Sequence, residues 1–120
     1  MHEASIAQHI IEQITERIDA GTLPSQIEKI YLKIGKLTAV VPDNLTFMFE
    51  VLSRDTALNN VQLVITEIQV RCRCRTCNSE YDTEEVNFWC RDCSSPDVTI
   101  ISGRELLIAS IEVEDADEKN

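Results

Sequence analysis

Residues 72–93 read CRCRTCNSEYDTEEVNFWCRDC, and this stretch decides how the chain is organised. It contains two CxxC pairs, Cys74 with Cys77 and Cys90 with Cys93. Each pair presents two thiolates from one tight backbone loop, so that four sulfurs can converge tetrahedrally on one zinc ion. The spacing between the pairs is slightly shorter than in the commonest four-cysteine pattern, but a β-hairpin can bridge it. We therefore expect a zinc-binding lobe over residues 71–97.

Ordinary packing, redox chemistry and iron binding are the alternatives for these cysteines. Four thiols in two CxxC pairs rarely arise for packing alone. The surrounding residues do not resemble the strand-to-helix setting of a thioredoxin-type redox motif. An iron site of the same four-thiolate type stays open on ligands alone. Zinc is favoured because closed four-cysteine sites are usually structural, and a lobe this short cannot be held together by core burial.

The lobe contains a fifth cysteine and three aromatic residues. Cys72 does not share the spacing of the two pairs, so we expect it to be a free thiol. Tyr81, Phe88 and Trp89 lie between the pairs, and we expect them to pack as a small core under the metal.

Before the lobe, the apolar residues recur with helical and then strand periods. Ile6, Ile10, Ile14 and Ile18 follow one another at four-residue spacing, which predicts an amphipathic helix over residues 4–20 that Gly21 ends. Residues 30–35 alternate apolar and polar side chains and predict a strand. Pro42 fits the first turn of a second helix, whose apolar positions are Leu45, Phe49 and Leu52.

Two further stretches have the composition of β-strands. Residues 61–70 read VQLVITEIQV, and the apolar phase shifts between Ile65 and Ile68, which predicts a bulge or bend there. Residues 98–114 read VTIISGRELLIASIEVE, where Ser102 and Gly103 offer a hairpin turn between two strands. The predicted fold is α+β, with two helices packed on a small mixed β-sheet and an inserted four-cysteine zinc-binding lobe. The predicted helix/sheet domain comprises residues 1–70 plus 98–115, and residues 116–120 form an acidic disordered tail.

Charge and hydropathy limit the partners and the location. Among 120 residues, 21 are Asp or Glu and 11 are Lys or Arg, which leaves a formal net charge of -10. Such a surface disfavours nucleic acid as a partner. No apolar run is long enough to span a membrane, and the chain does not open with a signal-peptide pattern. We therefore expect a cytoplasmic protein without a membrane partner.

The amino terminus, Met1-His2-Glu3, can chelate a metal ion. The imidazole of His2, its backbone nitrogen and the terminal amine of Met1 can close fused five- and six-membered chelate rings, with the Glu3 amide or a carboxylate as a fourth ligand. Such a nitrogen-rich set suits Ni(II) or Cu(II) better than Zn(II). The alternative is a solvated histidine near a frayed terminus, but the helix that begins at once opposes fraying. His9, on the same helical face, is an auxiliary ligand or a solvent-facing residue.

These features together resemble a known family. The opening MHE, the two CxxC pairs, and GREL followed by IEVE are similar to the HypA/HybF nickel metallochaperones of [NiFe]-hydrogenase maturation, over essentially the whole chain. The resemblance implies one nickel bound through His2, with Met1 and Glu3 as backbone or auxiliary ligands, and one structural zinc. It also implies a HypB-like GTPase partner and delivery of nickel to the hydrogenase large-subunit precursor; some relatives supply urease. We expect a monomer or weak homodimer.

Two residues depart from the family pattern, and one other function competes. Asn78 follows the first CxxC where Gly is frequent, and Arg91 stands where the second often has Pro, which puts the rigidity of the lobe in doubt. The competing function is a zinc-ribbon module for protein–protein interaction, in which His2 has no role. An enzyme is disfavoured because the chain has no HExxH, no phosphate-binding glycine loop and no GxSxG, and a closed four-thiolate site leaves no position for an activated water.

Overall fold

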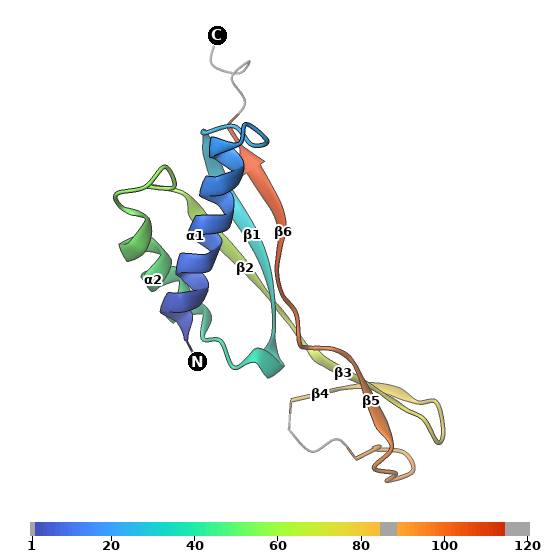
Figure 1. Ribbon diagram of the computed structural model, residues 1–120. Helices are drawn as coiled ribbons and strands as arrows, with labels where there is room; N and C mark the ends of the chain where they lie inside the picture. The colour runs from blue at the N-terminus through green and yellow to red at the C-terminus, as the bar shows by residue number, and fades with distance from the viewer. Residues whose placement is uncertain (1, 85–88, 115–120) are drawn as a thin grey trace. The chain divides into compact units, whose positions relative to one another are not determined.

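The computed structural model describes residues 2–84 and 89–114 (Figure 1). The described part of the chain has an α+β fold with two α-helices, as predicted. Its elements are α1 (Glu3–Asp19), β1 (Ile27–Gly35), the 3-10 helix η1 (Lys36–Thr38), α2 (Pro42–Ser53), β2 (Gln62–Ile68), β3 (Val70–Cys74), β4 (Glu80–Thr83), β5 (Val98–Ser102) and β6 (Leu106–Val113). Met1, Phe88 and the predicted acidic tail lie outside the described residues.

The described residues divide into two compact units. The helical unit comprises residues 2–32, 40–65 and 108–114, and the cysteine unit comprises residues 33–39, 66–84 and 89–107. Each unit therefore combines segments that lie far apart in the sequence, and β1 and β2 each contribute residues to both units.

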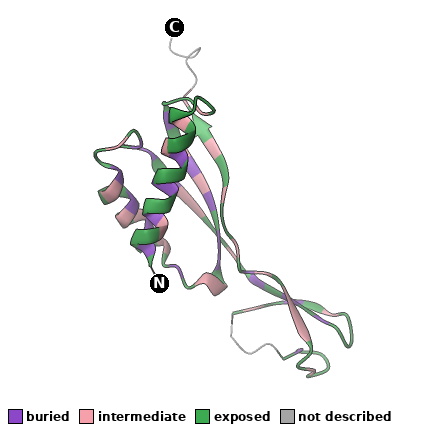
Figure 2. Ribbon diagram, viewed as in Figure 1, coloured by how far each residue is buried: buried purple, intermediate pink, exposed green. Residues whose placement is uncertain are grey.

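Helix α1 has the apolar stripe that the sequence predicts. Its buried apolar residues are Ala7, Ile10, Ile11 and Ile14, and the α1 ribbon in Figure 2 carries both buried and exposed stretches along its length. The helix ends where Gly21 adopts a left-handed backbone with φ of +79°, and the Gly21 N–H donates to the carbonyl of Ile18 at 3.1 Å. Glycine occupies this conformation without a side-chain clash, which explains why the helix stops there.

Helix α2 begins at Pro42, as predicted, because the first turn of a helix has no intrahelical partner for the N–H that proline lacks. Leu45 and Phe49 point inward and are almost fully buried. They join α1 and the inner faces of two strands in the core of the helical unit, whose other members include Ile27, Ile30, Leu32, Leu58, Val61 and Leu63. Neither described helix is long and apolar enough to cross a membrane.

The strands of the described residues form two sheets, each with three strands. The order is β2-β1-β6 in one and β4-β3-β5 in the other, where β3 pairs antiparallel with both neighbours. The predicted hairpin at Ser102–Gly103 is therefore wrong, since β5 and β6 belong to different sheets. A hairpin turn and a crossing between sheets use the same turn residues, so the local sequence does not distinguish them.

Gly103 makes this crossing together with Gly35. The backbone of Gly103 has φ of +116°, and its carbonyl accepts the N–H of Leu37 at 2.9 Å. The N–H of Gly35 donates to the carbonyl of Glu105 at 2.7 Å. A Cβ atom on Gly35 would overlap the carbonyl of Gly103, so these two backbones approach closely only because Gly35 has no side chain.

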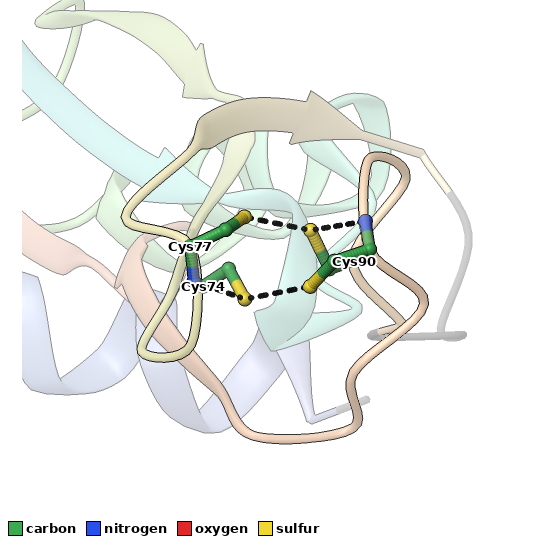
Figure 3. Close-up of side chains that lie close together, drawn as sticks. Cys74, Cys77 and Cys90 are labelled. Atoms are coloured by element: carbon green, nitrogen blue, oxygen red, sulfur yellow. Dashed lines mark hydrogen bonds between the residues drawn. The ribbon is translucent and has the colours of Figure 1, made fainter.

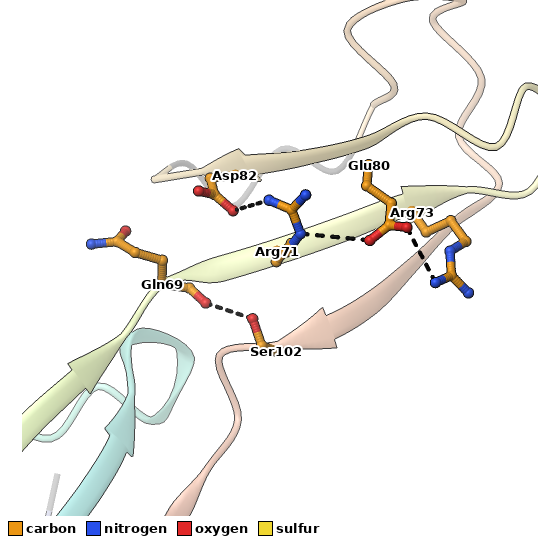
Figure 4. Close-up of polar contacts among 6 residues, drawn as sticks. All are labelled: Gln69, Arg71, Arg73, Glu80, Asp82 and Ser102. Carbon is orange, nitrogen blue, oxygen red and sulfur yellow. Dashed lines mark hydrogen bonds and ion pairs between the residues drawn. The ribbon is translucent and has the colours of Figure 1, made fainter.

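The chain also changes sheets between β2 and β3. The sequence predicts a bulge or bend between Ile65 and Ile68, but β2 continues unbroken to Ile68 and the interruption falls at Gln69. The hydroxyl of Ser102 donates to the carbonyl of Gln69 at 2.9 Å, which ties the end of β5 to this interruption (Figure 4). The phase shift thus indicates a sheet change one residue before it occurs.

One face of the β4-β3-β5 sheet forms the core of the cysteine unit. Its buried members are Val70, Cys72, Cys74, Tyr81 and Cys90, with Leu37, Val98 and Ile100 packed against them. The strand period places Cys72 on the same face as Cys74, and the Cys72 side chain is 0% exposed. Burial raises the pKa of the Cys72 thiol. Trp89 was expected in this core but is 56% exposed; Tyr81 and aliphatic residues from β5 and η1 fill the space instead.

The opposite face of β3 is charged and paired across the strands. Arg71 lies 2.8 Å from Asp82 and 3.5 Å from Glu80, and Arg73 lies 3.3 Å from Glu80 (Figure 4). Arg71 stands opposite Asp82 and Arg73 opposite Glu80 in the antiparallel register of β3 and β4. Exposed pairs of this kind contribute little to stability, and opposite charges across β3 and β4 favour this register over a shifted one.

Candidate metal centre

The four cysteines of the two CxxC pairs lie together in the cysteine unit. All four Sγ atoms lie within 4.8 Å of one another. The Sγ of Cys74 lies 3.5 Å from that of Cys93, and the Sγ of Cys77 lies 3.6 Å from that of Cys90 (Figure 3). The two pairs come from separate loops, and each sulfur of one loop thus faces a sulfur of the other.

The two loops have the same backbone geometry. In each, the sulfur of the first cysteine accepts two backbone N–H groups, from the second and third residues after it, at 3.3–3.5 Å. The N–H of the first cysteine donates to the carbonyl five residues later at 2.9 Å. The accepting sulfurs belong to Cys74 and Cys90, and the carbonyls to Ser79 and Ser95. Such amide donors stabilise a thiolate, the form of cysteine that binds metal.

The residue after each CxxC adopts a left-handed backbone. Asn78 has φ of 63° and Ser94 has φ of 61°, and their N–H groups donate at 2.9 Å to the carbonyls of Cys74 and Cys90. This conformation explains why glycine suits the position. Asparagine tolerates it better than most residues, so the departure at Asn78 leaves the first loop with the same hydrogen bonds as the second.

Arg91 and a pair of hydroxyls hold the second loop in place. The guanidinium of Arg91 lies 5.1 Å from the centre of the Tyr81 ring and donates to the carbonyl of Asp82. The hydroxyls of Thr76 and Ser95 lie 2.9 Å apart and link the two loops directly. Neither contact follows from a spacing rule, so no pattern in the sequence predicts it. Arg91 therefore connects the second loop to β4, and its presence in place of proline does not leave the loop without support.

Hydrogen bonds and neighbouring sulfurs shift the pKa values of three cluster cysteines in different directions. Hydrogen bonds from the backbone N–H of Cys77 and then of Thr76 lower the pKa of Cys74 to about 6. The hydroxyl and backbone of Ser79 lower the pKa of Cys77. The N–H of Ser95 lowers the pKa of Cys93. The hydrogen bond between Cys93 and Cys74, the desolvation of Cys93 and its other sulfur neighbours outweigh this effect and raise the pKa of Cys93 to about 12. A positive ion at the centre of the cluster would favour the thiolate form of its cysteines.

The sulfur positions match a tetrahedral metal site. With Zn–S bonds of about 2.3 Å, ideal tetrahedral geometry sets the sulfurs about 3.8 Å apart. The two short sulfur separations of 3.5 and 3.6 Å, and the upper bound of 4.8 Å, are compatible with this size. Four convergent thiol donors with amide hydrogen bonds form a metal-binding cluster, and the set fits zinc. Buried Cys72 is not a member of this group.

His2 lies at the start of α1 with its side chain exposed. It is the N-cap residue, and its carbonyl accepts the N–H of Ile6 at 3.1 Å, which begins the helix. Within the described part of the chain, no side chain caps the helix at this position. The imidazole is therefore presented from a backbone that the helix already orders. Met1, the other predicted ligand at this end, lies outside the described residues.

Glu3 differs sharply from its neighbour in exposure. Glu3 is only 9% exposed, and its carboxylate accepts the backbone N–H of Val41 at 3.0 Å. The Val41 N–H is the main reason that the pKa of Glu3 is lowered; the N–H of Glu3 itself, the terminal amine and His2 lower it further. Val41 is the N-cap residue of α2, so Glu3 joins the first residues of the two helices.

His2 and His9 line different hollows in the surface of the helical unit. The hollow at His2 has a volume of about 350 Å³ and is lined by His2, Glu3, Ala4, Asn44, Phe47 and Met48. The hollow at His9 has a volume of about 460 Å³ and is lined by Ala4, Ser5, Gln8, His9, Glu12 and Leu52. The contribution of α2 to the surroundings of His2 is a tertiary feature that no local pattern predicted.

Comparisons with known proteins agree with this geometry. A family model described as "Hydrogenase/urease nickel incorporation, metallochaperone, hypA" matches residues 1–113. A hydrogenase maturation factor HypA from Desulfosudis oleivorans is 43% identical over 120 residues, covering 96% of this chain and 100% of the relative. A HypA from Desulfatibacillum aliphaticivorans is 41% identical, with 98% and 91% covered.

One curated relative carries a different name, and a solved structure shares the fold. The guanidine hydrolase-activating protein A of a Synechocystis species is 40% identical, covering 93% of this chain and 94% of the relative. The solution structure of the nickel metallochaperone HypA from Helicobacter pylori has a TM-score of 0.64 and 23% identity, with 94% and 97% of the two chains covered. The match over nearly the whole length shows that this chain belongs to the HypA family of hydrogenase and urease nickel-incorporation metallochaperones.

Proposed function

We propose that this protein binds Ni(II) at its amino terminus and delivers it for [NiFe]-hydrogenase maturation. The description of the matching family names nickel incorporation, and most of the relatives described above are hydrogenase maturation factors. The observation that carries the proposal is the exposed imidazole of His2 on an ordered backbone, next to a hollow. The protein acts as a carrier without catalytic turnover.

The proposed nickel ligands come from consecutive residues. The imidazole and backbone nitrogen of His2 and the amine of Met1 form the fused chelate, and Glu3 contributes its backbone or an auxiliary group. Amine, amide and imidazole nitrogens favour Ni(II) over cations that prefer oxygen ligands. His9 lines another hollow and is not included in this set.

Zn(II) is the proposed resident ion of the cysteine cluster, held by Cys74, Cys77, Cys90 and Cys93. Bound zinc would stabilise the lobe because it would join the two cysteine loops through one ion. Four thiolates would also close its coordination shell and leave no position for water. Residues 71–97 are then the zinc-binding lobe, and residues 1–70 with 98–115 the nickel-binding domain. The two metal sites share no residue.

The proposed partners are a HypB-like GTPase and the precursor of the hydrogenase large subunit. The acidic net charge of -10 suits basic segments on such a partner, and this attraction would weaken with salt. The relative named as a guanidine hydrolase-activating protein makes such a hydrolase, like urease, a second candidate client. We place this exchange in the cytoplasm, between this chain as a monomer or weak homodimer and its partners.

Equilibrium dialysis with Ni(II) on zinc-loaded protein tests the nickel site. We expect one nickel per chain, retained by His9→Ala and lost in His2→Ala, with zinc unchanged in both. No nickel uptake by the wild-type protein would favour the alternative, a zinc-ribbon module for protein–protein interaction. Pull-down with a HypB-like GTPase at low and high ionic strength tests the partnership, and failure at low salt with folded, zinc-loaded protein would contradict it.

A further inference from the structure

We infer that Glu3 is a positioning residue of the nickel site, whose carboxylate holds the first turn of α1 on the start of α2 instead of ligating nickel. This inference rests on the proposed function, because it assigns a role within the same site. His2 and Glu3, although adjacent, then have different roles. His2 supplies donor atoms, and the side chain of Glu3 fixes where those atoms lie.

The contact of Glu3 with Val41 carries the inference. The carboxylate accepts the Val41 N–H at 3.0 Å, and the carbonyl of Val41 accepts the N–H of Leu45 at 3.0 Å as α2 begins. In a capping box, a glutamate within a helix reaches back to the N–H of its own N-cap residue. Here the glutamate that serves the N-cap of α2 comes from α1. One carboxylate therefore completes the start of α2 and attaches the start of α1 to it.

The exposures of the residues involved fit this arrangement. Glu3 is 9% exposed, whereas His2 is exposed and Val41 keeps 47% of its surface accessible. Glu3 thus holds a peptide group and not the Val41 side chain. To ligate nickel, the carboxylate would have to leave a partly buried hydrogen bond, whereas the backbone nitrogens of the terminus need no such rearrangement.

Fixing Glu3 orders the residue that the chelate needs. The carbonyl of His2 is held by the N–H of Ile6, and the next residue is held by Val41. The peptide between His2 and Glu3 therefore lies between two fixed points. Releasing it would return backbone freedom that metal binding must then remove again, which corresponds to about a tenfold loss of affinity.

Two substitutions of Glu3 distinguish positioning from ligation. The side chain of Glu3→Gln keeps an oxygen that accepts the Val41 N–H but lacks the carboxylate that would bind nickel, and Glu3→Ala lacks both. We expect Glu3→Gln to bind Ni(II) within about threefold of wild type in equilibrium dialysis, and Glu3→Ala to bind about tenfold more weakly. At saturating nickel, the visible absorption spectrum of both complexes should equal that of wild type. Equal losses in the two variants, or a changed spectrum in Glu3→Gln, would overturn the inference.

The partner residue provides an independent test. Val41→Pro removes the N–H, and the Val41 φ of -91° lies near the range of proline, while Val41→Ala keeps the N–H as a control. We expect the double variant Glu3→Ala/Val41→Pro to bind nickel no more weakly than the worse single variant, because both remove one contact. Additive losses would contradict a shared contact. His2→Ala separates the two claims, since nickel retained there would refute the nickel site itself.

Discussion

Asn78 and Ser94 hold equivalent positions in the two cysteine loops and share one unusual backbone conformation, with φ of 63° and 61°. Each follows the second cysteine of its pair and donates its N–H to the carbonyl of the first. The left-handed conformation is thus part of how each loop closes around its sulfurs. The two loops are built alike although Thr76 in the first stands where Asp92 stands in the second.

Substitution at Ser94 should therefore change the stability of the zinc-bound lobe. A β-branched residue is strained at positive φ, so Ser94→Val should lower the free energy of unfolding by about 1–2 kcal/mol, whereas Ser94→Gly should leave it equal or higher. Zinc retention against a competing chelator measures this difference. Retention by Ser94→Val equal to that of Ser94→Gly would show that the position bears no strain.

Removal of the Cys90 thiol, a member of the cluster, should release the metal, while removal of the Cys72 thiol should not. Cys90→Ala deletes a proposed ligand, and Cys72→Ala makes the same chemical change in the core beneath the cluster, where Cys72 is fully buried. We expect Cys90→Ala to lose stoichiometric zinc and Cys72→Ala to keep one zinc per chain with lower thermal stability. Metal analysis after chelator challenge decides the matter, and zinc retained by both variants would refute the ligand assignment.

Zinc binding should release close to four protons per chain near neutral pH. The lobe without metal is expected to be unfolded, and unfolded thiols have pKa values near 8.5, so about four protons leave as four thiolates form. Acidification therefore weakens binding. If the lobe stayed folded without zinc, the pKa of Cys74 at about 6 would leave that thiol already ionised at pH 7, and fewer protons would be released. Calorimetry of zinc binding in buffers of different ionisation enthalpy measures the number of protons released.

Gly35 should tolerate no side chain, for steric reasons alone. Its backbone is extended, with φ of -74°, but a Cβ atom would overlap the Gly103 carbonyl. Because backbone must move to relieve the overlap, Gly35→Ala should destabilise the protein by about 1–3 kcal/mol. Gly21→Ala is the matched control, since its Cβ would meet nothing within 4 Å and only its φ of +79° is unfavourable. Thermal unfolding compares the two, and the larger loss is expected at Gly35.

Extension of the chain before Met1 should weaken nickel binding without affecting zinc. One added glycine converts the Met1 amine into a peptide nitrogen, which is a poorer donor because it must lose a proton that amides hold tightly. Affinity should also rise with pH, since the amine, amide and imidazole nitrogens bind the metal without their protons. Dialysis and visible absorption of the nickel complex provide the readouts. An extended protein with unchanged affinity and spectrum would remove the Met1 amine from the ligand set.

Patterns that depend on neighbouring residues were readable from the sequence. The stripe of α1, the glycine that ends it and Pro42 at the start of α2 each depend on backbone conformation within a few residues. The convergence of the two CxxC pairs was predictable for the same reason, because each loop sets two sulfurs locally and only twelve residues separate Cys77 from Cys90.

Contacts between distant segments required the tertiary structure. Ser102 and Gly103 have turn propensity in a hairpin and in a crossing alike, and only the pairing of β5 with β3 and of β6 with β1 separates the two. Trp89 stays exposed because Tyr81 and aliphatic residues of β5 and η1 fill the core of the cysteine unit. The bond between Glu3 and Val41 joins residues 38 positions apart, and no local propensity encodes it. The sequence by itself determined which residues carry donor atoms, through their chemistry and spacing; the tertiary structure decided which backbone groups hold them, because those groups meet only after the helices and sheets have packed.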